Sequence, residues 1–205
     1  MTRSPTINPL SSLWRGRRVG LLGGSFNPAH QGHLMISRQA LRHLALDEVW
    51  WLVSPQNPLK DAAGMAPLED RLSTARGVAR DRRVRITDIE TRLGTQFTVD
   101  TLAELCQRFR STQFVWLMGA DNMAQVTRWA RWQDIFHLTP VAVFGRPTYS
   151  LQAMFSKAAL CFARSRLPAY RAPELAGMRP PAWTFIHYRH DSISATAIRA
   201  AKEAT

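Results

Sequence analysis

The sequence is poor in cysteine and has no long apolar run. Its two cysteines, Cys106 and Cys161, lie far apart and form no CxxC pair, which argues against a disulfide framework and against a cysteine zinc site. Such cysteine usage is typical of a reducing compartment, and we expect a cytoplasmic protein. Because no apolar run approaches the length of a membrane-spanning helix, we expect no membrane partner.

Acidic residues are also scarce. Asp and Glu number 15 against 27 Lys and Arg, which gives a formal net charge of +12. This charge suits anionic partners, either nucleic acid or small nucleotides. The basic residues are scattered and no recognised nucleic-acid motif is present, so a stable nucleic-acid partner is not expected. With no acidic cluster, we expect no metal ion held mainly by protein ligands.

Length and composition indicate one globular domain. The chain has 205 residues, of which 45% are apolar, enough for a sizeable core. Residues 1–18 contain two prolines, four arginines and no acid, a composition typical of a transit peptide or of a flexible basic extension. We favour the extension, which leaves residues 19–205 as the domain.

Apolar runs and helical spacings alternate along the chain. Strands are predicted at 19–22, 48–53, 83–90, 114–118, 140–144 and 183–187. Helices are predicted from about residue 34 to 44, at 68–80, 98–109 and 151–166, and in a short final segment to 202, whereas the proline-rich 167–181 reads as a loop. This alternation predicts an α/β domain with a mainly parallel sheet covered by helices on both faces.

The most informative segment, GGSFNPAHQGHL, runs from Gly23 to Leu34, between the first strand and the first helix. Adjacent glycines permit a sharp turn and the close approach of a ligand. The start of a helix offers backbone N–H groups and a positive dipole end to phosphate. His30 and His33, three residues apart, are expected on one side of the first turn, which makes this a candidate polyanion site.

Several alternatives to this interpretation fit less well. The segment is not the GxGxxG of dinucleotide-binding folds, and it lacks the Gly-Lys-Ser/Thr ending of a P-loop. Two histidines without a flanking Glu, Asp or Cys make a poor zinc site. The simplest alternative is that the glycines mark a turn and the histidines cap a helix.

The segment closely resembles the GGSFDPxHxGH signature of the HxGH nucleotidylyltransferases. Near the C-terminus, ISATAIR at 193–199 resembles their second signature, ISxTxIR. The two motifs occur in the family's order, and the finer match, from about Val19 to Lys202, is to the bacterial nicotinate-nucleotide adenylyltransferases. The resemblance implies a single Rossmann-like domain. Asn27 stands where the signature has Asp, and we expect this difference to cause a modest loss of activity at most.

The resemblance implies residues for both substrates. The ATP-binding residues it implies are Gly23, Gly24, Ser25, Phe26, His30, His33, Asp121, Arg146, Ile193, Ser194 and Arg199. Of these, His30, His33 and Arg199 are expected to act on the reacting phosphates. The acceptor-binding residues it implies are Lys60, Thr98 and Trp129. Thr98 lies in FTVDTL, similar to the family's YTxxTL, and Trp129 begins a WARW element whose counterpart stacks on the nicotinate ring.

The implied reaction joins ATP to nicotinate mononucleotide, with Mg²⁺ bound through the substrate phosphates. Nicotinamide mononucleotide and phosphopantetheine remain alternative acceptors, and a basic nucleic-acid binder on the same fold is a third hypothesis. In the loop that carries Lys60, Pro58-Leu59 stands where the family has Pro-His. The family's role for the lysine is therefore assigned to Lys60 more safely than the roles of the other loop residues are assigned here. A homo-oligomer is possible.

Overall fold

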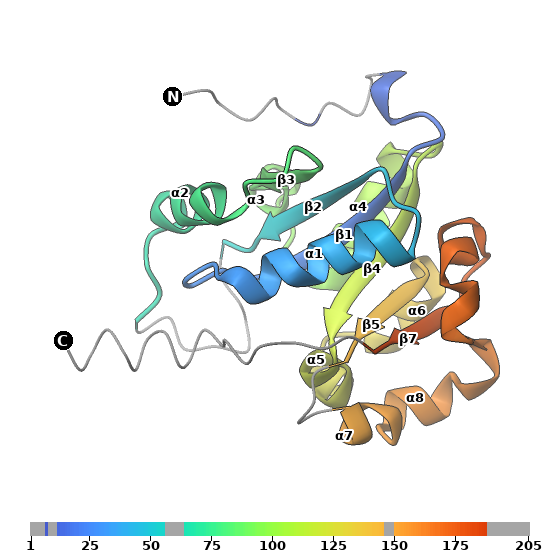
Figure 1. The fold of residues 1–205 in the computed structure, drawn as a ribbon. Helices are drawn as coiled ribbons and strands as arrows, with labels where there is room; N and C mark the ends of the chain where they lie inside the picture. Colours follow the sequence, from blue (N-terminus) through green and yellow to red (C-terminus); the bar gives the residue numbers. More distant parts are fainter. Residues whose placement is uncertain (1–6, 8–11, 56–63, 146–149, 188–205) are drawn as a thin grey trace.

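Strands and helices alternate in the computed structural model, which describes residues 7, 12–55, 64–145 and 150–187 (Figure 1). In chain order the elements are η1 (Ser12–Trp14), β1 (Arg18–Gly24), α1 (Gln31–His43), β2 (Glu48–Val53), α2 (Leu68–Val78), β3 (Val84–Thr87), α3 (Ile89–Leu93), α4 (Thr98–Arg108), β4 (Gln113–Gly119), α5 (Ala120–Gln125), η2 (Val126–Arg128), α6 (Trp132–Leu138), β5 (Val141–Phe144), α7 (Ser150–Met154), α8 (Lys157–Cys161), η3 (Ala163–Ser165), β6 (Arg166–Leu167), η4 (Ala169–Gly177) and β7 (Trp183–Ile186).

The described strands form one sheet in the order β3-β2-β1-β4-β5-β7-β6. Every pairing is parallel, so the predicted Rossmann-like α/β arrangement is confirmed. From β1 the chain first builds outward through β2 and β3, and it then returns to the other side of β1 with β4. This reversal creates a switch point between β1 and β4, where open α/β sheets bind ligands at the carboxyl ends of the strands.

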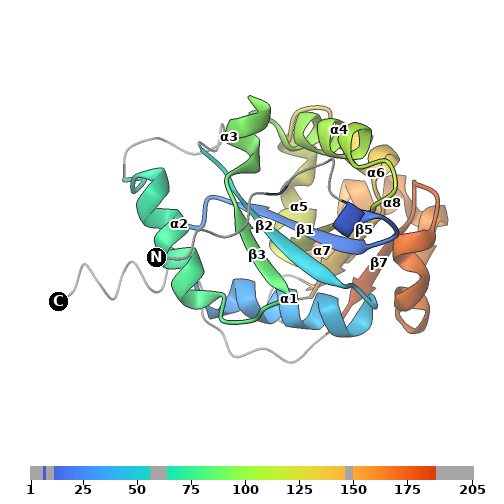
Figure 2. The same ribbon diagram turned by 90° about the horizontal axis from the view of Figure 1, so that it is seen from above.

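Helices cover both faces of the sheet (Figure 2). Successive strand residues face opposite sides, so Trp50 and Leu52 belong to one buried cluster while Trp51 and Val53 belong to the other. The first cluster packs under α3 to α8, and the second under α1, α2 and η4. Burial on both faces explains why the strands are continuous apolar runs rather than alternating ones. None of the helices in the described part of the chain combines the length and apolarity needed to cross a bilayer.

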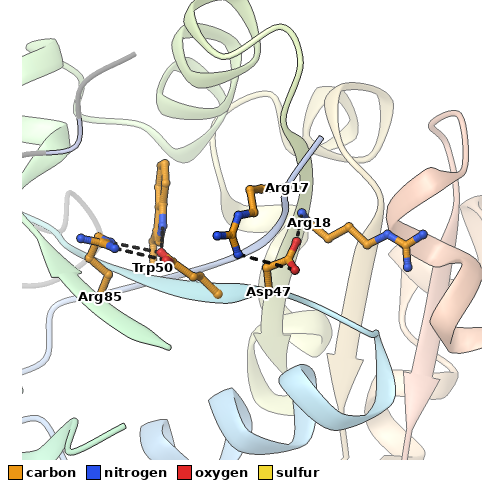
Figure 3. Close-up of polar contacts among 6 residues, drawn as sticks. Arg17, Arg18, Asp47, Trp50 and Arg85 are labelled. Carbon is orange, nitrogen blue, oxygen red and sulfur yellow. Dashed lines mark hydrogen bonds and ion pairs between the residues drawn. The ribbon is translucent and has the colours of Figure 1, made fainter. Parts of the chain in front are cut away.

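Two carboxylates join the strands at the amino-terminal edge of the sheet (Figure 3). Asp47 accepts a hydrogen bond of 2.8 Å from the backbone N–H of Arg18. Glu48 accepts from the guanidinium of Arg85 at 3.1 and 3.2 Å and from the indole N–H of Trp50 at 3.3 Å. These contacts tie β1, β2 and β3 together at the edge opposite the carboxyl ends, which leaves the other edge for ligands.

Part of the segment before β1 packs on the core. Trp14 is buried, and its ring meets Trp50 edge to face with 4.8 Å between centroids. The guanidinium of Arg85 lies 5.2 Å from the centre of the Trp14 ring, a cation–π distance. Ile7 is buried as well. Residues within 1–18 therefore contribute to the core on the α4 side of the sheet.

The predicted strand at 83–90 is too long. β3 ends at Thr87, and α3 follows and ends at Leu93, where the C-cap Gly94 adopts a left-handed conformation with φ of 65°. Glycine adopts that conformation without strain. The apparent alternation of Ile86 and Ile89 thus came from a strand followed by a helix, with Ile86 buried in the cluster of Trp51 and Ile89 buried in the cluster of Trp50 on the other side of the sheet.

Two further predictions between 151 and 181 are wrong in detail. The predicted helix at 151–166 is two short helices, and α8 starts anew where the Ser156 side chain accepts from the N–H of Ala159 at 3.2 Å. The predicted loop at 167–181 contains β6 and η4, whose Leu175 and Ala176 are buried against the sheet. The prolines there were read as breaks, but apolar contacts with the sheet stabilise the 3₁₀ turns.

Candidate active site at the carboxyl edge of the sheet

The turn after β1 and the start of α5 after β4 lie together at the switch point. β1 and β4 are neighbours with Leu22 paired to Leu117, so their ends are level and about 5 Å apart. The first predicted signature starts with the last two residues of β1 and continues into α1, and Asp121 lies two residues beyond the end of β4. Residues nearly a hundred positions apart are therefore brought to one edge, as the parallel sheet requires.

Gly23 and Gly24 are the last two residues of β1, so the sharp turn predicted at these glycines is wrong, and Gly23 is required by packing instead. A Cβ atom added there would lie 2.4 Å from the Trp116 indole ring, a rigid group that could not move aside without disturbing β4. At Gly24 the same atom would make only an ordinary contact of 3.5 Å with Phe26. We expected both glycines to admit a ligand, and the structure gives Gly23 a second role in seating Trp116 against β1.

Phe26 fixes the turn through its side chain. Its φ is 48°, a left-handed conformation that is unusual and strained for a bulky residue. The ring is buried and stacks on Trp51 of β2 with 5.0 Å between centroids. It also lies 4.6 Å from the His33 ring. Packing against Trp51 therefore holds the backbone in a shape that it would not adopt alone.

His30 and His33 cap the start of α1 and lie side by side, with ring centroids 3.9 Å apart. The Nδ1 atom of His30 accepts from the N–H of Gly32 at 3.1 Å, and the Nδ1 atom of His33 accepts from the N–H of His30 at 3.2 Å. This reciprocal pattern is a capping box built from imidazoles. The prediction that the two rings share one side of the helix is confirmed, and so is the alternative that they cap it.

The capping bonds decide the protonation of both rings. A nitrogen that accepts from a backbone N–H carries no proton, so each neutral imidazole of His30 and His33 holds its proton on Nε2. Nε2–H is a donor suited to a phosphate oxygen. The N–H groups of His30 and Gly32 are used by the caps, so the expectation that the helix start offers these amides to a ligand is wrong for these two. At the start of α1, the Nε2–H groups of the two imidazoles are the donors suited to phosphate in place of these two amides.

Thr98 and Trp129, the predicted acceptor residues, are linked through their neighbours. Thr98 is the first residue of α4, whose N-cap is Phe97 without a side-chain bond, so Thr98 is not simply a capping residue. Trp129 is half-buried and meets Trp116 edge to face at 6.5 Å. An ion pair joins Asp100, in the first turn of α4, to Arg131. These contacts hold the start of α4 beside the segment that carries Trp129.

Glu90 is a buried carboxyl group that the sequence did not single out. Its side chain is only 6% exposed in α3, and burial raises its pKa to about 7, an effect that hydrogen bonds from Thr101 and Ser54 partly offset. Thr101 Oγ1 lies 3.3 Å from Glu90 Oε1. Glu90 thus connects the end of β2 with α4, the helix that begins at Thr98.

We predict that Glu90→Gln stabilises the fold at pH 8 but not at pH 5. The folded protein binds the Glu90 proton more tightly than the unfolded chain, whose pKa is near 4.5. Stability from this group therefore falls as pH rises from about 4.5 to about 7, and the full cost of about 3 kcal/mol is present above that range. Urea unfolding at both pH values measures it.

Glu69→Gln, at an exposed position of α2, is the control and should change stability little at either pH. A gain for Glu90→Gln that is equal at pH 5 and pH 8 would contradict the assigned protonation.

Arg71 is the second functional candidate that the sequence did not single out. It is 2% exposed in α2 and bonds the carbonyl group of Ser25 in the turn. A pattern was available, because Arg71 falls on the apolar stripe of α2 together with Leu72 and Ala75. An arginine at a core position needs internal partners, which marks it for attention.

The remaining predicted residues follow other strand ends. Lys60, Arg146, Ile193, Ser194 and Arg199 lie outside the described residues. The strands β2, β5 and β7 that precede them point to the same edge as β1.

The chain is similar to known proteins over most of its length. The model of the cytidylyltransferase-like family matches residues 21–201. A Parvibaculum lavamentivorans protein named probable nicotinate-nucleotide adenylyltransferase is 54% identical over 187 residues, 91% of this chain and 93% of that one. The chain belongs to the cytidylyltransferase-like family, among its nicotinate-nucleotide adenylyltransferases. A relative of the same name from Methylorubrum extorquens is 50% identical over 89% of this chain and 98% of its own.

Solved structures share the fold of the family at low sequence identity. The nicotinic acid mononucleotide adenylyltransferase of Plasmodium falciparum, in complex with NaAD, superposes with a TM-score of 0.68. It is 14% identical, with 90% of this chain and 83% of that one covered. The same protein in complex with APC gives a TM-score of 0.66. The family's fold is thus retained in this chain although most side chains differ between the two proteins.

Proposed function

We propose that the protein joins ATP to nicotinate mononucleotide, giving nicotinate adenine dinucleotide and pyrophosphate, a step of NAD biosynthesis. The observation that carries this proposal is the histidine pair at the β1–β4 switch point. Both rings are fixed by backbone bonds to Nδ1, which places their protons on the nitrogen that can donate to phosphate. The family membership of the chain supports the same reaction.

The transfer needs no protein nucleophile. A phosphate oxygen of the mononucleotide, already ionised at neutral pH, attacks the α-phosphorus of ATP. The bond from that phosphorus to the oxygen bridging to the β-phosphate breaks, and its electron pair leaves on pyrophosphate. Two anions must be aligned and the charge on the leaving group stabilised, so positioning and electrostatics provide most of the rate.

On the ATP side, His30 and His33 would donate from Nε2 to oxygens of the reacting phosphates. The end of β1 at Gly23 and Gly24 and the turn that begins at Ser25 would bring backbone and hydroxyl donors to the same group, and Phe26 holds that turn on β2. Asp121 at the end of β4 would meet the adenosine part. The backbone bonds to Nδ1 already fix the orientation of both imidazoles, which favours catalysis by preorganisation.

The C-terminal motif is within reach of this turn. Three strand spacings, about 14 Å in total, separate β1 from β7, and both strands end at the same edge. Seven residues lead from Ile186 to Ile193, and an extended chain of that length spans up to about 25 Å. We propose that Ile193 and Ser194 bind ATP and that Arg199 binds its phosphates, with Lys60 and Arg146 as further cations.

On the acceptor side, Trp129 would stack on the pyridine ring and Thr98 would bind its acid group. The Asp100–Arg131 ion pair supports this because it holds the two elements beside each other. Among the described residues no group of three His, Cys, Asp or Glu side chains could hold a metal ion, so Mg²⁺ would arrive on the substrate phosphates and neutralise part of their charge. We place the enzyme in the cytoplasm, without a nucleic-acid partner.

The proposal predicts a strong preference for the acid acceptor. With ATP in excess, kcat/KM for nicotinate mononucleotide should exceed that for nicotinamide mononucleotide at least about 100-fold, because a site built for a buried charged or polar group rejects an analogue that leaves it unpaired. Parallel assays of pyrophosphate release measure the ratio, with phosphopantetheine as a third acceptor. Equal efficiency with acid and amide, or no release while oligonucleotides bind in a salt-sensitive manner, would contradict the assignment.

A further inference from the structure

The guanidinium of Arg71 joins three segments of the chain at the candidate site. Its Nη1 atom donates to the carbonyl oxygens of Ser25 at 2.7 Å and Ser54 at 2.6 Å, and its Nη2 atom to that of Pro55 at 3.0 Å. Its Nε atom donates to the carbonyl oxygen of Ala66 at 2.9 Å. Ser25 belongs to the turn after β1, whereas the other three residues belong to the connection between β2 and α2.

Every described partner of Arg71 is a neutral carbonyl oxygen. Burial accordingly lowers the pKa of Arg71, but an arginine remains charged in proteins. Burying a cation without a carboxylate is unfavourable, although the guanidinium satisfies four carbonyl oxygens that an apolar side chain would leave without a donor. A positive charge set directly beneath a phosphate-binding turn suits an anionic ligand, because the field at this turn is only weakly screened by water.

Asn27 makes a second connection between the same segments. Its Nδ2 atom donates to the carbonyl oxygen of Gly64 at 3.0 Å, and its Oδ1 atom accepts from the N–H of Ala66 at 3.3 Å. An aspartate at this position could accept from Ala66 but could not donate to Gly64. The amide therefore has a use here that the carboxylate of the usual signature lacks, and Ala66 is held by both Asn27 and Arg71.

We propose that Arg71 is a positioning residue of the transfer reaction, and that it acts together with Asn27. Arg71 fixes the phosphate-binding turn, through Ser25, to residues 54–55 and 64–66, and Asn27 closes the same connection from the turn. The two groups set the alignment of the two nucleotide phosphates rather than the affinity for either nucleotide. This inference rests on the proposed function.

The test is Arg71→Lys, which retains the charge but replaces the fork by a single ammonium that cannot reach all four carbonyl groups. We expect kcat for dinucleotide formation to fall about 100-fold, as a small misplacement of reacting groups does. KM for ATP and for nicotinate mononucleotide should each change less than about threefold. The matched control is Arg76→Lys, at an exposed position of the same helix, which should behave as wild type.

Asn27 provides a second measurement that does not depend on the stability of an Arg71 variant. Asn27→Ala should lower kcat about tenfold and Asn27→Asp less, because the aspartate retains one of the two bonds. Since Asn27 and Arg71 hold the same segment, the loss in Asn27→Ala/Arg71→Lys should be clearly smaller than the product of the single losses. Multiplicative losses would overturn the shared role.

Two other results would overturn the inference. One is wild-type kcat in Arg71→Lys. The other is a loss of kcat that matches the unfolded fraction seen by circular dichroism and disappears when the assay is cooled, which would mean that Arg71 only stabilises the fold. A wild-type protein that forms no dinucleotide overturns the proposed function and this inference together, whereas an active wild type with an equally active Arg71→Lys overturns this inference alone.

Discussion

Replacing His30 by asparagine should lower kcat for dinucleotide formation roughly 10²–10³-fold, the usual cost of removing one donor to a developing charge. Asparagine is a good N-cap residue, so its side-chain oxygen can take over the bond that His30 Nδ1 now accepts from the N–H of Gly32. It offers no donor at the position of Nε2. The variant therefore separates the capping role from the chemical one, which His30→Ala cannot do.

Thermal unfolding and steady-state kinetics together test this prediction. The melting temperature of His30→Asn should stay close to that of wild type, while His30→Ala loses both activity and about 1 kcal/mol of stability through the missing cap. His43→Asn, on the last turn of the same helix, is the control and should retain full activity. A His30→Asn variant with kcat within threefold of wild type would show that the imidazole serves only as a cap.

Replacing Arg199 by alanine should lower kcat about 100-fold or more, because a guanidinium fork that binds the reacting phosphates contributes mainly in the transition state. Arg199→Lys should recover only part of the loss, since an ammonium is not bidentate. We expect Arg199 to act at the turn after β1 because the segment that carries it follows β7, and the parallel sheet brings the end of β7 to the same edge as the end of β1.

Arg42→Ala, at an exposed position near the end of α1, removes one positive charge without touching the site. Comparing it with Arg199→Ala separates a direct contact from the general field of a chain with a net charge of +12. Similar small, salt-sensitive losses of kcat in both variants would show that Arg199 acts only through the general positive field of the protein. A much larger loss in Arg199→Ala that persists at high salt would assign it to the site.

Much of the fold could be predicted because its strands are buried on both faces. Runs such as 49–53 and 114–118 are apolar throughout and lie between segments with helical spacing, which is typical of parallel sheets. The order of the strands in the sheet could not be predicted from such a pattern, because it depends on how distant segments of the chain pack together. The predictions failed where local composition was ambiguous, as at Ile89, which was assigned to the face of Ile86 but belongs to the helix α3 and packs in the opposite cluster.

The site was predicted in its motifs but not in its supporting contacts. The turn and the histidine pair lie within twelve residues, so their neighbourhood follows from the sequence alone. The contacts of Arg71 join residues up to 46 positions apart, and their partners are backbone carbonyl groups that every residue possesses. No residue type marks such partners. The packing requirement for glycine at position 23 could not be predicted for the same reason, because Trp116 belongs to a strand almost a hundred residues away.

The replacement of the usual signature Asp by Asn27 shows how the structure refines an expectation. From the sequence, the amide was expected to support the turn with a modest loss of activity. In the structure it bonds both Gly64 and Ala66, so its role is to connect the turn to the chain that follows β2. An amide can donate and accept, and this geometry uses both functions.

A crystal structure of the protein with bound nicotinate adenine dinucleotide tests the central claim most directly, since that claim is that one edge of the sheet aligns both nucleotides. We predict that the diphosphate contacts Nε2 of His30 and the side chains of Ser194 and Arg199, and that the pyridine ring stacks on Trp129 with its acid group at Thr98. A dinucleotide bound away from the turn after β1, or a C-terminal motif on the opposite side of the molecule, would contradict the account.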